Sequence, residues 1–217
     1  MKKINQLYIA MLLSLLIIAG LPSCKKDGYL TDGGVSKATT SLSTYDYLKN
    51  NQYHQFDTVI TLIDHYKLKD TINSAKTFFA FTDIDVHQLM ITLRVTSLSQ
   101  LTDSVSSKLF KQYIFSNTIT LDGASLTAVP YTNIMGSSVP CAIKKISSIE
   151  YLNLTNSALA INYFTLQYVK VNGVLDGSAG APDDDPVDVV LSCQTTGIQT
   201  STGTTLHVFN NNSLLTH

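Results

Sequence analysis

The run Lys76-Thr77-Phe78-Phe79-Ala80-Phe81-Thr82 is compact and β-prone, and Asp83-Ile84-Asp85 follows it directly. Aromatic and β-branched residues at this density are typical of a short strand. Aspartate is a favoured helix N-cap. We therefore expect a strand over the run, and then a helix that begins at Asp83 or Asp85 and passes through Leu89, Leu93 and Val95.

Further helices are expected on both sides of this run. Thr44 is the candidate N-cap of a short helix with Tyr45 and Leu48, and Leu68 and Ile72 belong to an apolar connection. A second helix has an apolar stripe at the spacing i, i+3, i+4 and i+7, and a third has a similar stripe. The two stripes consist of Phe56, Val59, Ile60 and Ile63, and of Leu101, Val105, Leu109 and Tyr113.

From about Ile114 the pattern changes to β. Strands are predicted over residues 143–154, 158–171, 187–192 and 206–209, with a loop over residues 177–186. Asn172-Gly173 predicts a tight turn between strands. Helices first and strands second indicate an α+β domain.

The composition excludes several kinds of site. The 217 residues have a net charge of −1 and only 14% charged residues, with no Trp. Glu150 is the only Glu and Arg94 the only Arg, which rules out a Glu pair and an arginine-rich phosphate clamp. The weak net charge predicts no nucleic-acid partner. Together these features favour a non-catalytic protein without metal or cofactor.

The N-terminus predicts export and lipidation. Met1-Lys2-Lys3 precedes a mostly apolar stretch, which is shorter than a membrane-spanning helix, and Leu21-Pro22-Ser23-Cys24 resembles a bacterial lipobox. We expect a lipoprotein signal peptide over residues 1–23, a lipid on Cys24, a flexible tether over 24–40 and one domain over 41–217. An ordinary signal peptide or an uncleaved anchor is the alternative.

The residues after the lipobox also bear on location and redox state. Lys25-Lys26-Asp27 resembles a signal that sorts lipoproteins to the outer face of the outer membrane. With Cys24 lipidated, Cys141 and Cys193 remain. In an exported protein they form either one disulfide or two buried thiols, and both alternatives stay open.

Two segments carry a family resemblance. Thr77-Phe78-Phe79-Ala80-Phe81-Thr82-Asp83 resembles the first signature of fasciclin-like domains, and residues 198–210, which include Gly203 and His207, are similar to the second. Phe81 and Thr202 stand where the family has Pro and Asn, and Gln112-Tyr113 where it commonly has Tyr-His. The resemblance covers roughly residues 42–215.

The resemblance implies a β-wedge or sandwich flanked by N-terminal helices, and a role outside the cell in adhesion or surface binding. The signature residues that it singles out as structural are Thr77, Phe79, Ala80, Thr82, Asp83, Gly203 and His207. We therefore expect a lipid-anchored cell-envelope module that binds a protein or glycan. The alternatives are a structural subunit of an envelope assembly and a secreted hydrolase that uses Asp83 and Asp85.

Three groups of polar residues are candidate sites. His207 lies in an alternating strand and is interpreted as a hydrogen-bonded structural residue, with a ligand or proton acceptor as the alternative. Asp83 and Asp85 are interpreted as helix caps, with the hydrolase nucleophile as the alternative. Asp183-Asp184-Asp185 is interpreted as a solvated loop, with Ca²⁺ binding as the alternative.

Replacing Cys24 with Ala tests the lipid anchor. A protein that depends on acyl chains for membrane attachment loses that attachment when the acceptor thiol is removed. We expect the Cys24→Ala protein in the soluble fraction after cell lysis and the wild-type protein in the membrane fraction, as measured by immunoblotting. A Cys24→Ala protein that stays with the membranes contradicts lipid anchoring.

Overall fold

The computed structural model describes residues 38–154, 157–179, 181–211 and 215, with the backbone alone between residues 150 and 159. The predicted signal peptide, Cys24 and most of the predicted tether lie outside these residues. The described residues belong to one compact unit. Within the described part of the chain, no helix has the length and apolar character needed to cross a membrane.

The domain is α+β, as predicted. The helical half contains α2 (Thr44–Lys49), α3 (Asp57–His65), α4 (Lys69–Ser74), α5 (Asp83–Leu93), α6 (Leu98–Ser104) and α7 (Lys108–Lys111), with β1 (Thr77–Ala80) between α4 and α5. The strands that come after them are β2 (Ile114–Phe115), β3 (Val129–Tyr131), β4 (Cys141–Leu154), β5 (Ser157–Lys170), β6 (Val189–Gln199) and β7 (Thr205–Phe209), with a short 3₁₀ helix, η1 (Gly136–Ser138), before β4.

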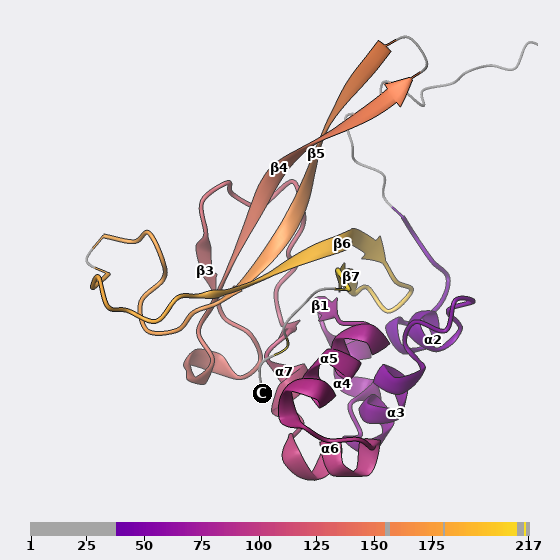
Figure 1. Cartoon of the computed structure of the whole chain (residues 1–217). Coiled ribbons are helices and arrows are strands. Elements are labelled where there is room, and N and C mark those ends of the chain that lie inside the picture. The colour runs from indigo at the N-terminus through magenta and orange to yellow at the C-terminus, as the bar shows by residue number, and fades with distance from the viewer. Residues whose placement is uncertain (1–37, 155–156, 180, 212–214, 216–217) are drawn as a thin grey trace, which may run out of the picture. The chain divides into compact units, whose positions relative to one another are not determined.

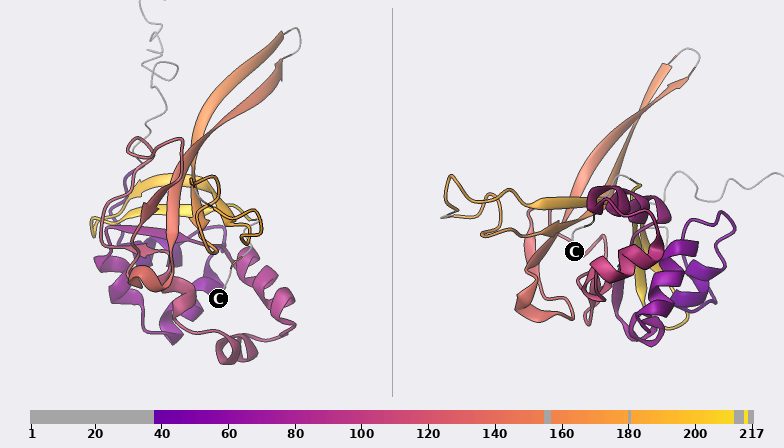
Figure 2. Two further views of the ribbon diagram at one scale, coloured as in Figure 1. Left: turned by 90° about the vertical axis from the view of Figure 1, so that its left-hand side faces the viewer. Right: turned by 60° about the horizontal axis from the view of Figure 1, so that its bottom comes forward.

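The strands form one curled sheet of seven strands in the order β2-β1-β7-β6-β5-β4-β3. The pair β1–β7 is parallel and the other pairs are antiparallel. Figure 1 shows the helices gathered beside β1 and β7, while β4 and β5 extend away from them. Figure 2 shows the same projection from two further directions.

Most predicted helices are present, with shifted ends. The stripe residues Val59, Ile60 and Ile63 are buried on α3, and Phe56 is buried just before it. Ser43, not Thr44, caps α2, because the Ser43 hydroxyl accepts from the Asp46 N–H. The connection that contains Ile72 is the helix α4. The single helix predicted from Leu101 to Tyr113 is wrong. The backbone is extended at Val105, so α6 ends before it, and Tyr113 follows the short helix α7.

The predicted tight turn at Asn172-Gly173 is wrong. β5 ends at Lys170 and β6 begins only at Val189, so the connection is long, includes the predicted loop, and has aspartates bound to its backbone N–H groups. Asp188 is buried and accepts from the N–H groups of Asn172 (2.9 Å) and Asp176 (2.8 Å). Gly173 has the positive φ of +80° that the sequence suggested, but at the start of this loop.

The domain begins earlier than residue 41. Thr39 pairs with Gln199 at the end of β6 in a parallel bridge. The Thr40 N–H donates to the Gln199 carbonyl at 2.9 Å, and the Gln199 N–H donates to the Ala38 carbonyl at 2.8 Å. The last residues of the predicted tether are therefore part of the sheet.

The predicted helix after the β-prone run is α5, and each aspartate has its own role there. Thr82 is the N-cap and forms a capping box with Asp85. Asp83 instead caps the neighbouring helix α3, accepting from the N–H groups of Thr58 (3.1 Å) and Val59 (3.0 Å). A carboxylate on these N–H groups stabilises α3, whose own N-cap, Phe56, has no side-chain acceptor.

Removing the Asp83 carboxylate should weaken the contact between α3 and α5. We expect Asp83→Ala to lower the free energy of unfolding by about 1–2 kcal/mol, the usual cost of a lost cap. Asp70→Ala is the matched control, because Asp70 is an exposed first-turn aspartate on α4, and it should change stability by less than about 0.5 kcal/mol. Urea unfolding measures the free energy of unfolding of both variants. Equal losses in the two variants contradict the role of Asp83 as the cap of α3.

Candidate functional site

The residues of the two signature segments lie side by side on neighbouring strands. The parallel register of β1 and β7 places Thr77 beside Thr205, Phe79 beside His207 and Ala80 beside Val208. Gly203 has a φ of +81° in the turn that leads from β6 into β7. The seven signature residues thus occupy β1, the start of α5 and the β6–β7 hairpin, which are contiguous in space.

His207 lies at the centre of this region, buried and hydrogen-bonded to backbone on both ring nitrogens. Its side chain is fully buried, and its ring stacks on that of Phe79 with centroids 4.7 Å apart. Nδ1 accepts from the Gly197 N–H at 3.1 Å, so Nε2 carries the proton and donates to the Ile119 carbonyl at 3.0 Å. Burial lowers the pKa of His207 to about 4, although the hydrogen bond to Ile119 favours the protonated form.

Thr77 holds the same segment as His207. Its hydroxyl donates to the Asn117 carbonyl at 2.9 Å and accepts from the Ile119 N–H at 2.8 Å. Residues 117–119 have no strand partner of their own, so these side chains satisfy their backbone groups. Thr77 and His207 therefore hold residues 117–119, in the connection between β2 and β3, against β1 and β7.

Asp83 and Asp85 serve as hydrogen-bond acceptors for the backbone. Asp85 is buried and accepts from the Thr82 N–H at 2.7 Å and the Thr82 hydroxyl at 3.0 Å. Both oxygens of Asp83 bind N–H groups of α3. Neither residue is the N-cap of α5, which is Thr82: Asp85 is its partner in the capping box, and Asp83 caps α3 instead.

The other polar candidates stay apart in the structure. Asp183 and Asp184 are exposed, and Asp185 accepts from the Val174 N–H at 2.8 Å. Among the described residues, no three His, Cys, Asp or Glu side chains gather as they would around a metal ion.

Cys141 and Cys193 are buried free thiols. They lie on β4 and β6, which are separated by β5, so their backbones are at least two strand spacings, roughly 10 Å, apart. A disulfide requires Cα atoms within about 7 Å. Of the two alternatives left open by the sequence, the structure therefore has the pair of buried thiols.

The most unusual element is a two-stranded ribbon, which we define as residues 144–154 of β4 and 157–166 of β5. β3 pairs only with Cys141–Ile143 of β4, and β6 only with Gln167–Lys170 of β5. Beyond these points β4 and β5 pair with each other, from Lys144 to Leu154. Within the described residues no further strand joins the ribbon, which projects about 35 Å at the rise of an antiparallel strand.

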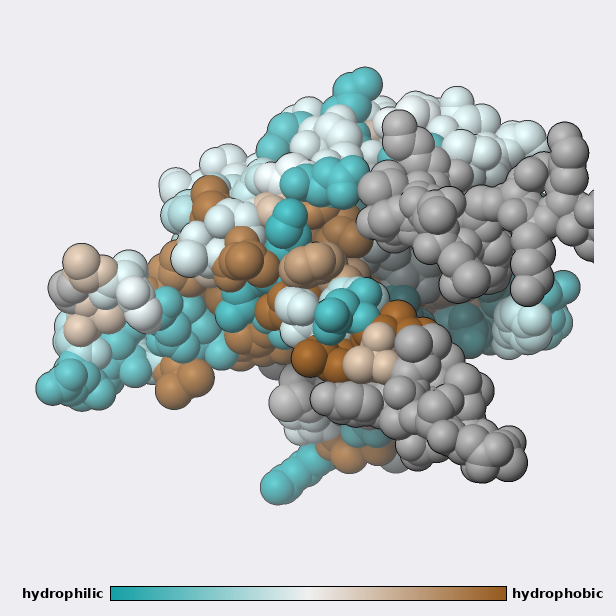
Figure 3. Space-filling model, turned by 90° about the horizontal axis from the view of Figure 1, so that it is seen from above, coloured by the Kyte–Doolittle hydropathy of each residue, from teal (hydrophilic) through white to brown (hydrophobic). Residues whose placement is uncertain are grey.

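The ribbon exposes large apolar side chains on both faces. Ile149 is 56% exposed and Phe164 46% exposed on one face, where Lys145 Nζ lies 5.7 Å from the Phe164 ring centre. Ile161 and Tyr163 are 39% and 42% exposed on the other face. Figure 3, which views the domain from the side on which the ribbon projects, shows hydrophobic surface among hydrophilic surface there.

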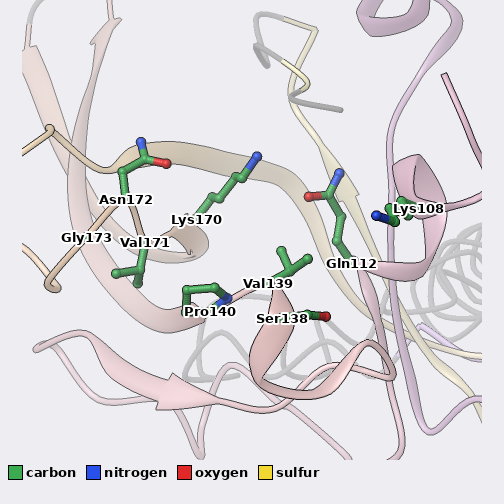
Figure 4. Close-up of a pocket in the computed structure, with 9 residues that line it drawn as sticks. All are labelled: Lys108, Gln112, Ser138, Val139, Pro140, Lys170, Val171, Asn172 and Gly173. Carbon is green, nitrogen blue, oxygen red and sulfur yellow. The ribbon is translucent and has the colours of Figure 1, made fainter. Parts of the chain in front are cut away.

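A separate cavity of about 470 Å³ lies at the other end of β5. Its walls come from α7, from the segment after η1 and from the start of the β5–β6 loop. Figure 4 shows Lys170 extending from β5 toward the side where Gln112 and Lys108 lie. The lining residues are Lys108, Gln112, Ser138, Val139, Pro140, Lys170, Val171, Asn172 and Gly173, without an acidic side chain.

Neither the ribbon nor the cavity was anticipated from the sequence. One local feature could have indicated the ribbon, namely the length of its two strands. β4 and β5 have 14 residues each, whereas β6 has 11 and β7 has 5, so parts of β4 and β5 must extend past the ends of neighbouring strands. No local feature indicates the cavity, because only tertiary packing brings the segments of Lys108 and Lys170 to it.

No family model matches the chain, and a comparison with curated proteins finds no match either. The function of the domain is therefore inferred from its geometry and its sequence motifs.

The buried neutral His207 should make stability depend on pH. Its pKa is about 4 in the folded state and about 6.5 when unfolded, so between these values only the unfolded chain binds the proton. The free energy of unfolding therefore falls as the pH drops from about 6.5 to 4, by about 3 kcal/mol from this residue.

Comparison with His207→Gln isolates this contribution from the carboxylates, which titrate in both proteins. Between about pH 7 and pH 4.5, the wild-type protein should lose about 2–3 kcal/mol more than the variant, measured by urea unfolding. Parallel pH dependences for the two proteins contradict a neutral buried His207.

Proposed function

We propose that the protein is a lipid-anchored, non-catalytic binding module of the cell envelope, with one fasciclin-like domain that recognises a protein or glycan. The observation that carries the proposal is the ribbon, which exposes apolar side chains on both faces away from the helical half of the domain. The contiguity of the two signature segments supports the fasciclin-like assignment. The lipobox-like sequence at Cys24 and the adjoining Lys25-Lys26-Asp27 support attachment to the outer membrane, with surface exposure.

The chemistry of the ribbon favours a protein over a glycan. A strand without a neighbour presents a row of backbone N–H and C=O groups that an extended segment of another chain can pair with. Such pairing also buries the aliphatic and aromatic side chains on either face. An isolated two-stranded hairpin is only marginally stable in water, so an added strand stabilises it further.

Two other functions remain as alternatives. A structural subunit of an envelope assembly would use the same ribbon, but it would co-purify with one partner in fixed proportion. A hydrolase would need Asp83 or Asp85 for turnover. Both carboxylates accept hydrogen bonds from backbone N–H groups, so this alternative has less support than binding.

Substitution of one ribbon residue tests the proposal against a matched control. Ile149 on the ribbon and Ile91 on α5 are both 56% exposed, so Ile149→Lys and Ile91→Lys add the same charge to equally exposed sites. After cross-linking on intact host cells, we expect the Ile149→Lys protein to be recovered with at least about tenfold less cross-linked partner than the wild-type protein. Ile91→Lys should recover the wild-type amount, and circular dichroism checks that both variants fold.

Three results would contradict this proposal. One is a wild-type protein that cross-links to neither protein nor glycan, and another is equal loss of cross-linking in both variants. The third is hydrolysis of a phosphate or carboxyl ester that disappears in Asp83→Asn.

A further inference from the structure

The two long edges of the ribbon differ from each other. On the β4 side, the Lys145 N–H donates to the Ser125 carbonyl at 2.7 Å, so a loop occupies the start of that edge. On the β5 side, β6 pairs with β5 only as far as Gln167, and Figure 1 shows β6 diverging from the ribbon beyond that point. In the part of the chain that the structure describes, no strand besides β4 pairs with residues 157–166.

The β5 edge lacks the features by which sheet edges usually avoid pairing with another chain. Such edges commonly carry charged residues, proline or a β-bulge. The register of β5 with β4 continues without a shift to the end of the ribbon. Neither a charged residue nor a proline occurs in the run Ser157-Ala158-Leu159-Ala160-Ile161-Asn162-Tyr163-Phe164-Thr165-Leu166. This edge is therefore suited to pair with a further uncharged strand.

The sequence of this edge is complementary to itself. When two copies of β5 pair antiparallel about a twofold axis at Asn162, Ile161 of one copy lies opposite Tyr163 of the other. In the same register Ala160 lies opposite Phe164, so a small side chain faces a large one. Pairs of aromatic and β-branched residues on opposite strands are favourable. Ile161, Tyr163 and Phe164 are exposed in the single chain, and this pairing covers all three.

Hydrogen bonding and charge both favour this arrangement. Antiparallel pairing over residues 158–166 adds about eight to ten backbone hydrogen bonds, close to the number in a typical protein interface. The charged residues of the ribbon, Lys144, Lys145 and Glu150, are all on β4. The β4 strands of the two copies lie three strand spacings, about 14 Å, apart, which exceeds the screening length of about 8 Å at physiological ionic strength. Repulsion between the copies is therefore weak.

We propose that the protein forms a twofold-symmetric dimer with a second copy of the chain, through antiparallel pairing of the β5 edges centred on Asn162. The two ribbons then form one four-stranded sheet in the order β4-β5-β5-β4. A sheet of this size is more stable than an isolated two-stranded hairpin. The dimer uses the ribbon but does not require the partner of the proposed function, because β4 remains the outer strand on both sides.

Disulfide trapping tests the proposed register. Asn162→Cys places two thiols opposite each other at the axis, where the Cα atoms of an antiparallel pair are about 4.5–5.5 Å apart, within reach of a disulfide. Ile149→Cys is the matched control, because Ile149 is the register partner of Asn162 but lies on β4, about 14 Å from its copy. After oxidation of the full-length protein in host membranes, we expect at least about tenfold more linked dimer for Asn162→Cys, measured by non-reducing electrophoresis.

A lysine at the axis tests the strength of the dimer. Asn162→Lys places two like charges about 5 Å apart on opposing strands, and we expect the dimer to weaken at least about tenfold. Ile149→Lys adds the same charge to β4 and should retain the wild-type affinity. Sedimentation of the full-length, detergent-solubilised proteins measures both dissociation constants, and circular dichroism checks that both variants fold.

The proposal is overturned if the wild-type protein sediments as a monomer, or if Asn162→Cys gives no more linked dimer than Ile149→Cys. A dimer of Asn162→Lys as tight as that of the wild-type protein also overturns it. Ile149→Lys should lose the partner of the proposed function while it keeps the dimer. Failure of the dimer and failure of the ribbon to bind a partner are therefore separate results.

Discussion

The parallel pairing of β1 with β7 is the constraint on which the rest of the domain depends. It joins a strand from the helical half to the last strand of the chain, with Phe79 beside His207. Through Thr77 and His207 the pair also fixes residues 117–119, and through Thr82 and Asp83 it positions the starts of α5 and α3. Each of these side chains is buried or bound to backbone. Their contacts therefore all depend on the register of β1 with β7.

The sequence predicted the features whose causes are local. The run from Lys76 to Thr82 became β1 and the cap of α5, and the α3 stripe is buried, because propensity and spacing are sufficient there. It missed α4, which buries only Ile72 and so has no stripe. It also assigned Asn172-Gly173 to a tight turn, because the carboxylates that bind the backbone of this loop, above all Asp188, lie up to 16 residues away.

The candidate sites depend on long-range geometry and were predicted less well. His207 was interpreted as a structural residue because the sequence places no cluster of possible ligands or catalytic partners around it, but its partners Gly197 and Ile119 could not be read from the sequence. The ribbon exists because β3 and β6 stop short of the ends of β4 and β5, and pairing between distant strands decides that. The cavity likewise joins α7 to the end of β5, 62 positions apart at Lys108 and Lys170.

The bridge between Thr39 and Gln199 has a mechanical consequence. If the chain is held at a membrane through its N-terminal side, any pull first reaches the fold where residues 38–42 meet β6 and the turn after it. The contacts there are the Thr40–Gln199 and Gln199–Ala38 bonds and the Ser201 N–H to the Leu42 carbonyl, at 2.9 Å. These few bonds would yield before the core, and each residue released would lengthen the link by about 3.4 Å. Under that condition, release of residues 38–42 would lengthen the link before load reaches the rest of the sheet.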